Sequence, residues 1–156
     1  MINKKLIGYN YSGRNGEAIK YIVVHDTGNP SRGAGAGNHY LYFNKPGRNA
    51  SAHYFVDSRE TLQIVEDHNS AWHCGDGKGR FGITNRNSIG IELCINSDGD
   101  WELTKERGID LIRYLLKKYD LPKERVVRHY DASLKNCPGK MSGMGWREWT
   151  RFYDEI

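Results

Sequence analysis

The sequence predicts an α/β fold, in which a single domain has a central mixed β-sheet flanked by α-helices. Short apolar, β-branched runs alternate along the chain with segments of helical periodicity, a pattern typical of a sheet covered by helices. The length of 156 residues suits one domain covering residues 1–156. A composition of 38% hydrophobic and 27% charged residues is ordinary for a folded domain and argues against extensive disorder.

The first half of the chain supplies a strand, a helix and a hairpin. Residues 21–25 (YIVVH) form an apolar, β-branched run that predicts a buried strand, and turn-forming residues follow it at 26–30. The aromatic-rich segment 38–44 precedes Lys-Pro-Gly and predicts a short helix. Residues 53–57 and 61–66 flank a Ser-Arg-Glu connection. These two runs predict a hairpin, which would make the sheet mixed.

The second half adds two strands and two helices. Residues 88–95 alternate between aliphatic and small or polar side chains, which predicts a strand. The apolar stripe over 104–119 predicts the longest helix, with Thr104 as its N-cap and Asp-Leu-Pro at its end. We expect a further strand over 125–129 and a terminal helix over 146–153.

Charge and hydropathy exclude some classes of protein. No run approaches the roughly 18 apolar residues of a transmembrane helix, so we expect no membrane insertion. The net charge of +4 is spread over short clusters, which favours an anionic polymer as partner without identifying it. A nucleic-acid-binding domain would rest on this charge alone, and we expect no nucleic-acid partner.

The chain carries three cysteines, Cys74, Cys94 and Cys137, and no apolar segment typical of a secretory signal at its start. An odd number of cysteines at irregular spacing argues against a disulfide framework. We therefore expect synthesis in a cytoplasm without a signal peptide.

Two histidines and a cysteine could form a metal site. His25 and His129 both follow β-branched runs, and strand ends deliver side chains to the edge of a sheet where α/β sites usually lie. Cys137 follows in the tight turn Asn-Cys-Pro-Gly. Three such ligands can hold Zn²⁺ and leave a fourth position for water. The spacing is not that of a compact zinc motif, so each residue could also be an ordinary core or loop residue.

Five segments carry a resemblance to a known family. The sequence resembles the zinc-dependent N-acetylmuramoyl-L-alanine amidases, the type shared with T7 lysozyme and the peptidoglycan recognition proteins, and especially catalytic domains of endolysins from phages and prophages of Gram-positive bacteria. The resemblance implies a T7 lysozyme-like fold. The matching segments are Ile22–Thr27, Ser51–Val56, Asn87–Glu92, Arg128–Asp131 and Lys135–Gly139.

The resemblance implies roles for individual residues. His25, His129 and Cys137 would be zinc ligands, and Glu92 and Lys135 would be catalytic. A carboxylate near a zinc-bound water can act as general base and then as general acid, and an ammonium group can stabilise an oxyanion. Without the resemblance, the favoured interpretations are an exposed strand residue for Glu92 and a solvated loop lysine for Lys135.

Two further positions bear on substrate and mechanism. Trp72 and His73 resemble a segment lining the substrate groove of the family and could contact sugar or peptide, although packing is an equal alternative for the aromatic ring. Where T7 lysozyme has a tyrosine before the histidine of its matching segment, this chain has Ala52, which makes Glu92 the favoured base. For His53, support of the zinc site and simple packing stay open.

The function that the resemblance implies is hydrolysis of the amide bond between N-acetylmuramic acid and L-alanine in bacterial peptidoglycan, leading to cell-wall degradation and host lysis. The enzyme would be a monomer made in the host cytoplasm that reaches the wall after release. Residues 1–156 could be an excised catalytic domain or a compact one-domain enzyme. The competing class is a peptidoglycan-binding module without activity. The cysteine in Cys-Pro-Gly favours the enzyme, because binding modules of this type lack that ligand.

Overall fold

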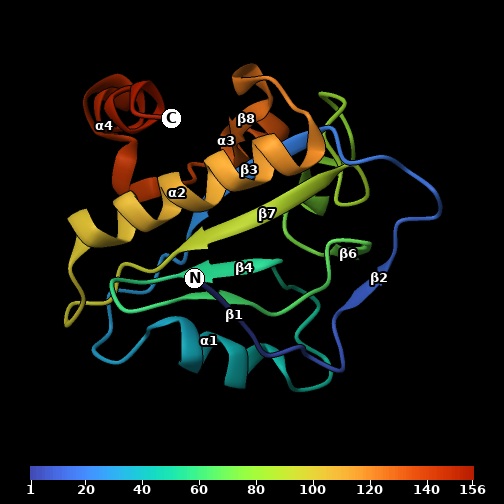
Figure 1. The fold of residues 1–156 in the computed structure, drawn as a ribbon, viewed down its shortest axis with the longest axis horizontal. Coiled ribbons are helices and arrows are strands. Elements are labelled where there is room, and N and C mark those ends of the chain that lie inside the picture. Colours follow the sequence, from blue (N-terminus) through green and yellow to red (C-terminus); the bar gives the residue numbers. More distant parts are fainter.

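A six-stranded sheet in the order β1-β5-β4-β7-β3-β8 forms the centre of the molecule (Figure 1). The computed structural model describes all of residues 1–156. The β4–β5 hairpin is the antiparallel pair, and the other pairs of this sheet are parallel, so the predicted mixed sheet is confirmed. The strands of the sheet are β1 (Ile2–Lys4), β3 (Tyr21–Asp26), β4 (Tyr54–Val56), β5 (Thr61–Gln63), β7 (Ser88–Leu93) and β8 (Val126–Arg128). A separate antiparallel pair consists of β2 (Tyr11–Gly13) and β6 (Asn69–Ala71).

Helices cover both faces of the sheet, as the sequence predicts. In Figure 1, α2 (Trp101–Tyr119) and α4 (Gly143–Asp154) lie on one face, and α1 (Ala36–Phe43) lies on the other. The short helix α3 (His129–Ser133) directly follows β8. Three single-turn 3₁₀ helices complete the fold: η1 (Gly75–Gly77), η2 (Lys123–Arg125) and η3 (Gly139–Met141).

The period-two alternation of β7 divides its side chains between the two layers. Its aliphatic residues pack with those of β3 against α2 and α4, which removes the largest apolar cluster from water. The opposite side of β7 presents Gly90 and Glu92. The main members of the large cluster are Ile22, Val24, Ile89, Ile91, Leu93, Ile109, Ile112, Leu115, Trp149 and Phe152.

The long helix begins earlier than the sequence predicts. Asp100, and not Thr104, is the N-cap, because its carboxylate accepts a hydrogen bond from the Leu103 N–H. Thr104 lies in the first turn, and its hydroxyl donates to the Asp100 carbonyl at 2.8 Å. The predicted end is confirmed: Asp120 has a left-handed backbone conformation with φ of 50° and terminates the helix.

Other boundaries differ in instructive ways. The strands β1 and β2 were not predicted, because their side chains are mostly exposed and carry no apolar alternation. The terminal helix α4 contains a non-helical stretch at Met144–Trp146, so regular helix runs from Arg147 to Asp154. The predicted hairpin and the strand predicted over 125–129 are confirmed with shorter strands, and His129 is not the last residue of that strand but the first residue of α3.

A buried carboxylate joins the end of α2 to the sheet. Asp67 is 6% exposed and accepts hydrogen bonds from the Tyr54 hydroxyl at 2.8 Å and the Lys118 ammonium at 2.7 Å. The Tyr119 hydroxyl also donates to it. Burial by itself would raise the pKa of Asp67, but these hydrogen bonds outweigh it and lower the pKa below its usual value.

Asp67→Asn is expected to destabilise the protein by about 1–3 kcal/mol at pH 7, because Lys118 loses its charged partner. A depressed carboxylate pKa contributes stability above about pH 4, and that contribution is lost as the pH falls through the lower folded-state value. Urea unfolding should therefore show the difference in the free energy of unfolding between wild type and variant shrinking as the pH falls below about 4. Asp110→Asn, at a side chain that is 80% exposed, is the matched control. Equal effects of the two substitutions would contradict the prediction.

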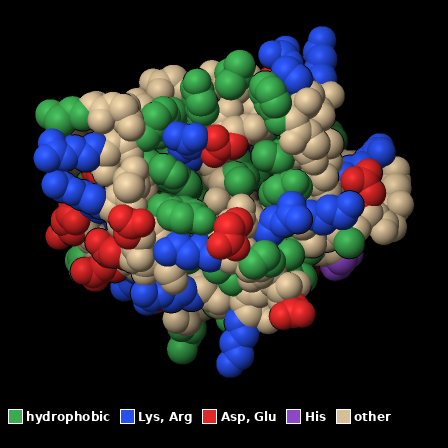
Figure 2. All heavy atoms as spheres, turned by 90° about the horizontal axis from the view of Figure 1, so that it is seen from above, with side chains coloured by type: hydrophobic (Ala, Val, Ile, Leu, Met, Phe, Trp, Pro, Cys, Tyr) green, Lys and Arg blue, Asp and Glu red, His purple; other side chains and the backbone are tan.

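The outer face of α2 and α4 carries basic and acidic side chains side by side, with no continuous basic stripe on the face that Figure 2 shows. A groove of 760 Å³ between the two helices is lined by residues of both signs, among them Lys105, Arg147, Glu102 and Glu148. No helix combines the length and the apolar character that a membrane span requires.

Candidate metal centre and active site

The registers of β3, β7 and β8 bring distant residues to one edge of the sheet. His25 on β3 is paired with Glu92 on the parallel strand β7. On the other side of β3, Val24 is paired with Arg128, the residue before His129. Directly paired residues of parallel strands point to the same face. Their carboxyl ends form the edge where α/β proteins usually place their sites.

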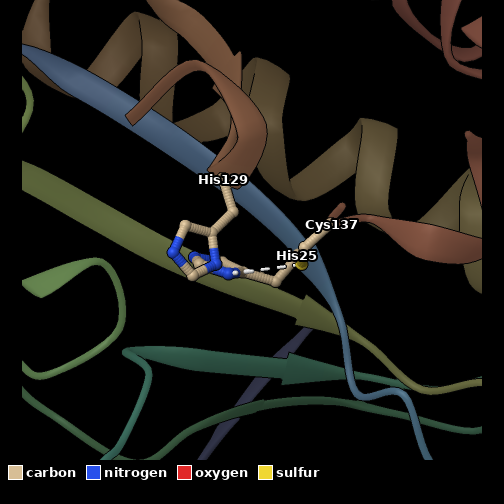
Figure 3. A group of neighbouring side chains, drawn as sticks. All are labelled: His25, His129 and Cys137. Carbon is tan, nitrogen blue, oxygen red and sulfur yellow. Dashed lines mark hydrogen bonds between the residues drawn. The ribbon is translucent and has the colours of Figure 1, made fainter. Parts of the chain in front are cut away.

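Cys137 joins the two histidines at this edge. One ligand atom from each of His25, His129 and Cys137 lies within 4.8 Å of the other two, and all three residues are buried. Nδ1 of His25 is 3.7 Å from the Cys137 Sγ, as drawn in Figure 3. The three side chains converge from β3, the start of α3 and the loop that follows α3. The predicted group therefore exists in the fold.

Each histidine has one ring nitrogen engaged with a neighbouring side chain. Nε2 of His25 lies 3.1 Å from Nδ1 of His73, and Nε2 of His129 lies 2.7 Å from the Asp76 carboxylate. Nδ1 of His129 is buried without a hydrogen-bond partner. In a metal-ligating histidine, one ring nitrogen typically hydrogen-bonds to a neighbouring group and the other faces the metal.

The loop carrying Cys137 is tied to β3 and α3. The backbone N–H of Lys140 donates to the Asp26 carboxylate at 2.6 Å, and the N–H of Tyr130 donates to the Cys137 carbonyl at 3.0 Å. Burial raises the pKa of the Cys137 thiol to about 12. The Asp26 bond holds the cysteine beside the strand that supplies His25.

Close packing also holds the partner of His129. Asp76 lies in η1, and the adjacent Gly77 packs directly against α3. A Cβ at Gly77 would lie 2.1 Å from the Ala132 carbonyl oxygen, so any side chain there would push η1 away. Glycine at this position allows Asp76 to reach the His129 ring.

Glu92 is placed to exchange a proton at this centre. Its Oε1 is 4.0 Å from Nδ1 of His25, and its Oε2 is buried without a hydrogen-bond partner. Burial and the nearby Asp26 carboxylate raise the pKa of Glu92 well above its ordinary value, against the opposing influence of Lys135. A carboxylate oxygen buried without a partner is costly, which makes Glu92 a candidate functional group.

A cavity of 280 Å³ opens over these residues. Lys135, which is exposed, and Trp72, whose indole N–H donates to the Ser12 hydroxyl at 3.2 Å, both line it. His73 lines it too, but both of its ring nitrogens have protein partners. The two predicted substrate contacts therefore differ: the Trp72 indole bonds to Ser12, outside the metal-ligand residues, whereas the His73 ring bonds to the ligand His25.

The residues present fit Zn²⁺. Two imidazoles and one cysteine sulfur are donors that zinc prefers, and three protein ligands leave one tetrahedral position open. The buried, unpartnered Nδ1 of His129 is a donor that the protein itself leaves free. This set would hold the metal at the floor of the cavity.

Comparison with known proteins identifies the family of this chain. The sequence profile described as N-acetylmuramoyl-L-alanine amidase matches residues 15–140. The chain belongs to this amidase family. The protein named N-acetylmuramoyl-L-alanine amidase CwlH of Bacillus subtilis is 39% identical over 142 residues, which are 90% of this chain and 56% of CwlH. The amidase XlyA of Bacillus subtilis is 39% identical over 121 residues, which are 78% of this chain and 40% of XlyA.

Solved structures of amidase domains have the same fold. The catalytic domain of XlyA superposes with a TM-score of 0.88 at 35% identity, covering 100% of this chain and 99% of that domain. A structure titled mutant endolysin from Bacillus subtilis gives 0.88 at 36% identity, covering 100% of this chain and 98% of that one. The chain spans 56% and 40% of the full-length CwlH and XlyA sequences.

The sequence does not predict Asp26 or Asp76 as residues of this site, and it predicts His73 as a substrate contact and not as a support of the metal-ligand residues. Asp26, Asp76 and the inward-facing ring of His73 hold the metal-ligand group, and only Asp26 adjoins a predicted ligand in sequence.

His53 is fully buried, and its Nδ1 accepts a hydrogen bond from the Gly90 N–H at 3.0 Å. Its Nε2 lies 3.1 Å from the Asn69 carbonyl oxygen, so both ring nitrogens contact groups outside the metal-ligand residues.

Proposed function

We propose that this chain is a zinc-dependent N-acetylmuramoyl-L-alanine amidase that hydrolyses the amide between N-acetylmuramic acid and L-alanine in peptidoglycan. The observation that carries the proposal is the buried group of His25, His129 and Cys137, whose ligand atoms lie within 4.8 Å of one another beside Glu92. Membership of the amidase family and the likeness to amidase catalytic domains support the same reaction.

The chain's residues would divide the chemistry among them. When bound, zinc lowers the pKa of a water molecule towards about 7 and polarises the scissile carbonyl. Glu92 accepts the proton of the attacking water and returns it to the leaving L-alanine amine. The Lys135 ammonium stabilises the negative charge that develops on the carbonyl oxygen. Trp72 offers an aromatic surface for sugar or peptide at the wall of the cavity.

End-group analysis of purified Gram-positive peptidoglycan tests the proposal. We expect new L-alanine N-termini, no new reducing sugars, and loss of the signal after treatment with a zinc chelator. Re-addition of Zn²⁺ should restore it. New termini from another residue would reassign the scissile bond, and activity that persists in the chelator would exclude the metal. Wall binding without new ends would make the protein a recognition module.

We also propose a cellular setting. Residues 1–156 would act as the catalytic domain, because they correspond to the whole catalytic domain of XlyA but to 40% of the XlyA sequence. The named relatives come from Bacillus, and one matched structure is titled an endolysin. These likenesses support degradation of a Gram-positive cell wall and host lysis, after release from the cytoplasm in which the protein is made.

A further inference from the structure

A chain of hydrogen bonds runs from the outer nitrogen of the His25 ring into the loop before β7. Nε2 of His25 lies 3.1 Å from Nδ1 of His73, and Nε2 of His73 lies 3.2 Å from the Ser88 hydroxyl. The Ser88 hydroxyl in turn donates to the backbone carbonyl of Thr84. This series of hydrogen bonds therefore ends on a carbonyl oxygen, which can only accept a hydrogen bond.

That last bond sets the direction of the others. Because the single Ser88 hydroxyl proton goes to the Thr84 carbonyl, Ser88 Oγ has to accept from Nε2–H of His73. Both ring nitrogens of His73 are paired with side chains that carry no negative charge, an imidazole and a hydroxyl, so nothing in contact with the ring favours its doubly protonated form. A neutral imidazole protonated on Nε2 has an unprotonated Nδ1, which accepts from Nε2–H of His25. His25 is then left with a lone pair on Nδ1, the nitrogen facing Cys137.

The fold makes room for this ring specifically. A Cβ at Gly90 would lie 2.5 Å from Cγ of His73, so a glycine on β7 is required where the ring crosses the strand. The backbone N–H of His73 donates to the Asn85 side-chain oxygen at 3.0 Å. The ring is therefore held by His25 on β3 and by Ser88 and Gly90 on β7, and the backbone of His73 is held by the loop before β7. This is the arrangement of a fixed support and not of a mobile substrate contact.

We propose that His73 is a positioning residue that fixes the tautomer of His25 and so presents Nδ1 of His25 to the zinc ion. The inference rests on the zinc site of the proposed function, but it does not depend on which bond the enzyme cleaves. The sequence predicts that His73 contacts the substrate. In this proposal His73 instead hydrogen-bonds to the metal ligand His25.

A matched pair of variants tests the role. In His73→Asn, the amide oxygen can take the place of Nδ1 and accept from His25. In His73→Gln, the longer side chain puts its polar atoms near the former Nε2 and leaves the His25 N–H without an acceptor. Competition with a chelator of known affinity gives the zinc Kd of each. We expect the asparagine variant within about threefold of wild type and the glutamine variant about 10–100-fold weaker.

Two further measurements keep the test decisive. Thermal unfolding of the metal-free variants should give equal midpoints for the asparagine and glutamine forms, so that a difference between their zinc affinities cannot come from a difference in fold stability. Long-range ¹H–¹⁵N NMR of the zinc-loaded wild-type protein should find the His25 proton on Nε2. A proton on Nδ1, or equal zinc affinities in the two variants, would overturn the proposal. None of these three measurements uses peptidoglycan. A failure of this proposal is therefore distinguishable from a failure of the proposed reaction.

Discussion

Glu92→Gln is expected to lower peptidoglycan hydrolysis by about 10²–10⁴-fold, the range typical for loss of a general acid–base group. The amide has the shape of the carboxylate but cannot take a proton from water at neutral pH. Oε2 of Glu92 is buried without a partner, so removing the charge should not destabilise the fold. Zinc content should be unchanged, because the expected ligands are His25, His129 and Cys137.

The measurement is release of new L-alanine N-termini, together with zinc content by elemental analysis and thermal unfolding. Glu66→Gln is the matched control, because it removes a carboxylate whose partner is a surface lysine 3.0 Å away. This control should keep wild-type activity. A Glu92→Gln enzyme with the wild-type rate and full zinc would remove Glu92 from the mechanism.

Cys137→Ser is expected to weaken zinc binding by at least about 10²-fold, with activity lost in proportion at limiting zinc. A neutral serine hydroxyl is a much poorer zinc donor than a thiolate, and the two remaining histidines would hold the metal alone. The Asp26–Lys140 hydrogen bond that anchors the loop uses a backbone N–H and should persist.

Chelator competition gives the zinc Kd, and hydrolysis measured across a zinc titration separates weak binding from a damaged site. Cys94→Ala is the control: Cys94 is also a buried free thiol, but it packs in the apolar cluster beneath α1. Its zinc affinity should match wild type. If Cys137→Ser retained full zinc affinity, the assignment of Cys137 as a ligand would be wrong.

The strands that carry the site were predictable from local pattern. A strand covered on both faces needs apolar residues, and the runs at 21–25 and 88–95 supply them. β2 has no such signal, because all three of its residues are exposed and backbone pairing with β6 holds it. The start of α2 was misplaced because Asp100 and Thr104 are both good N-caps, and only the Leu103 N–H distinguishes them.

The sequence by itself determined which chemistry is available. Two histidines that follow β-branched runs and a cysteine in a tight turn indicated a possible zinc site at one edge of a sheet, and the resemblance to the amidases implied that these residues and an acidic residue on an alternating strand form it. Those features are local, because strand period and turn chemistry depend on near neighbours. The structure brings the histidines and the cysteine together as predicted.

Only the tertiary structure decided how the site is supported. The partner of His129, Asp76, lies 53 residues away in the chain, and that of His25 lies 48 residues away. Residues adjacent in sequence can also have different partners. The indole N–H of Trp72 donates to the Ser12 hydroxyl, whereas the ring of His73 hydrogen-bonds to His25. A change of less than 1 Å in the distance between donor and acceptor decides whether a hydrogen bond forms. Strand register and close packing fix distances to that precision, whereas the type of residue does not.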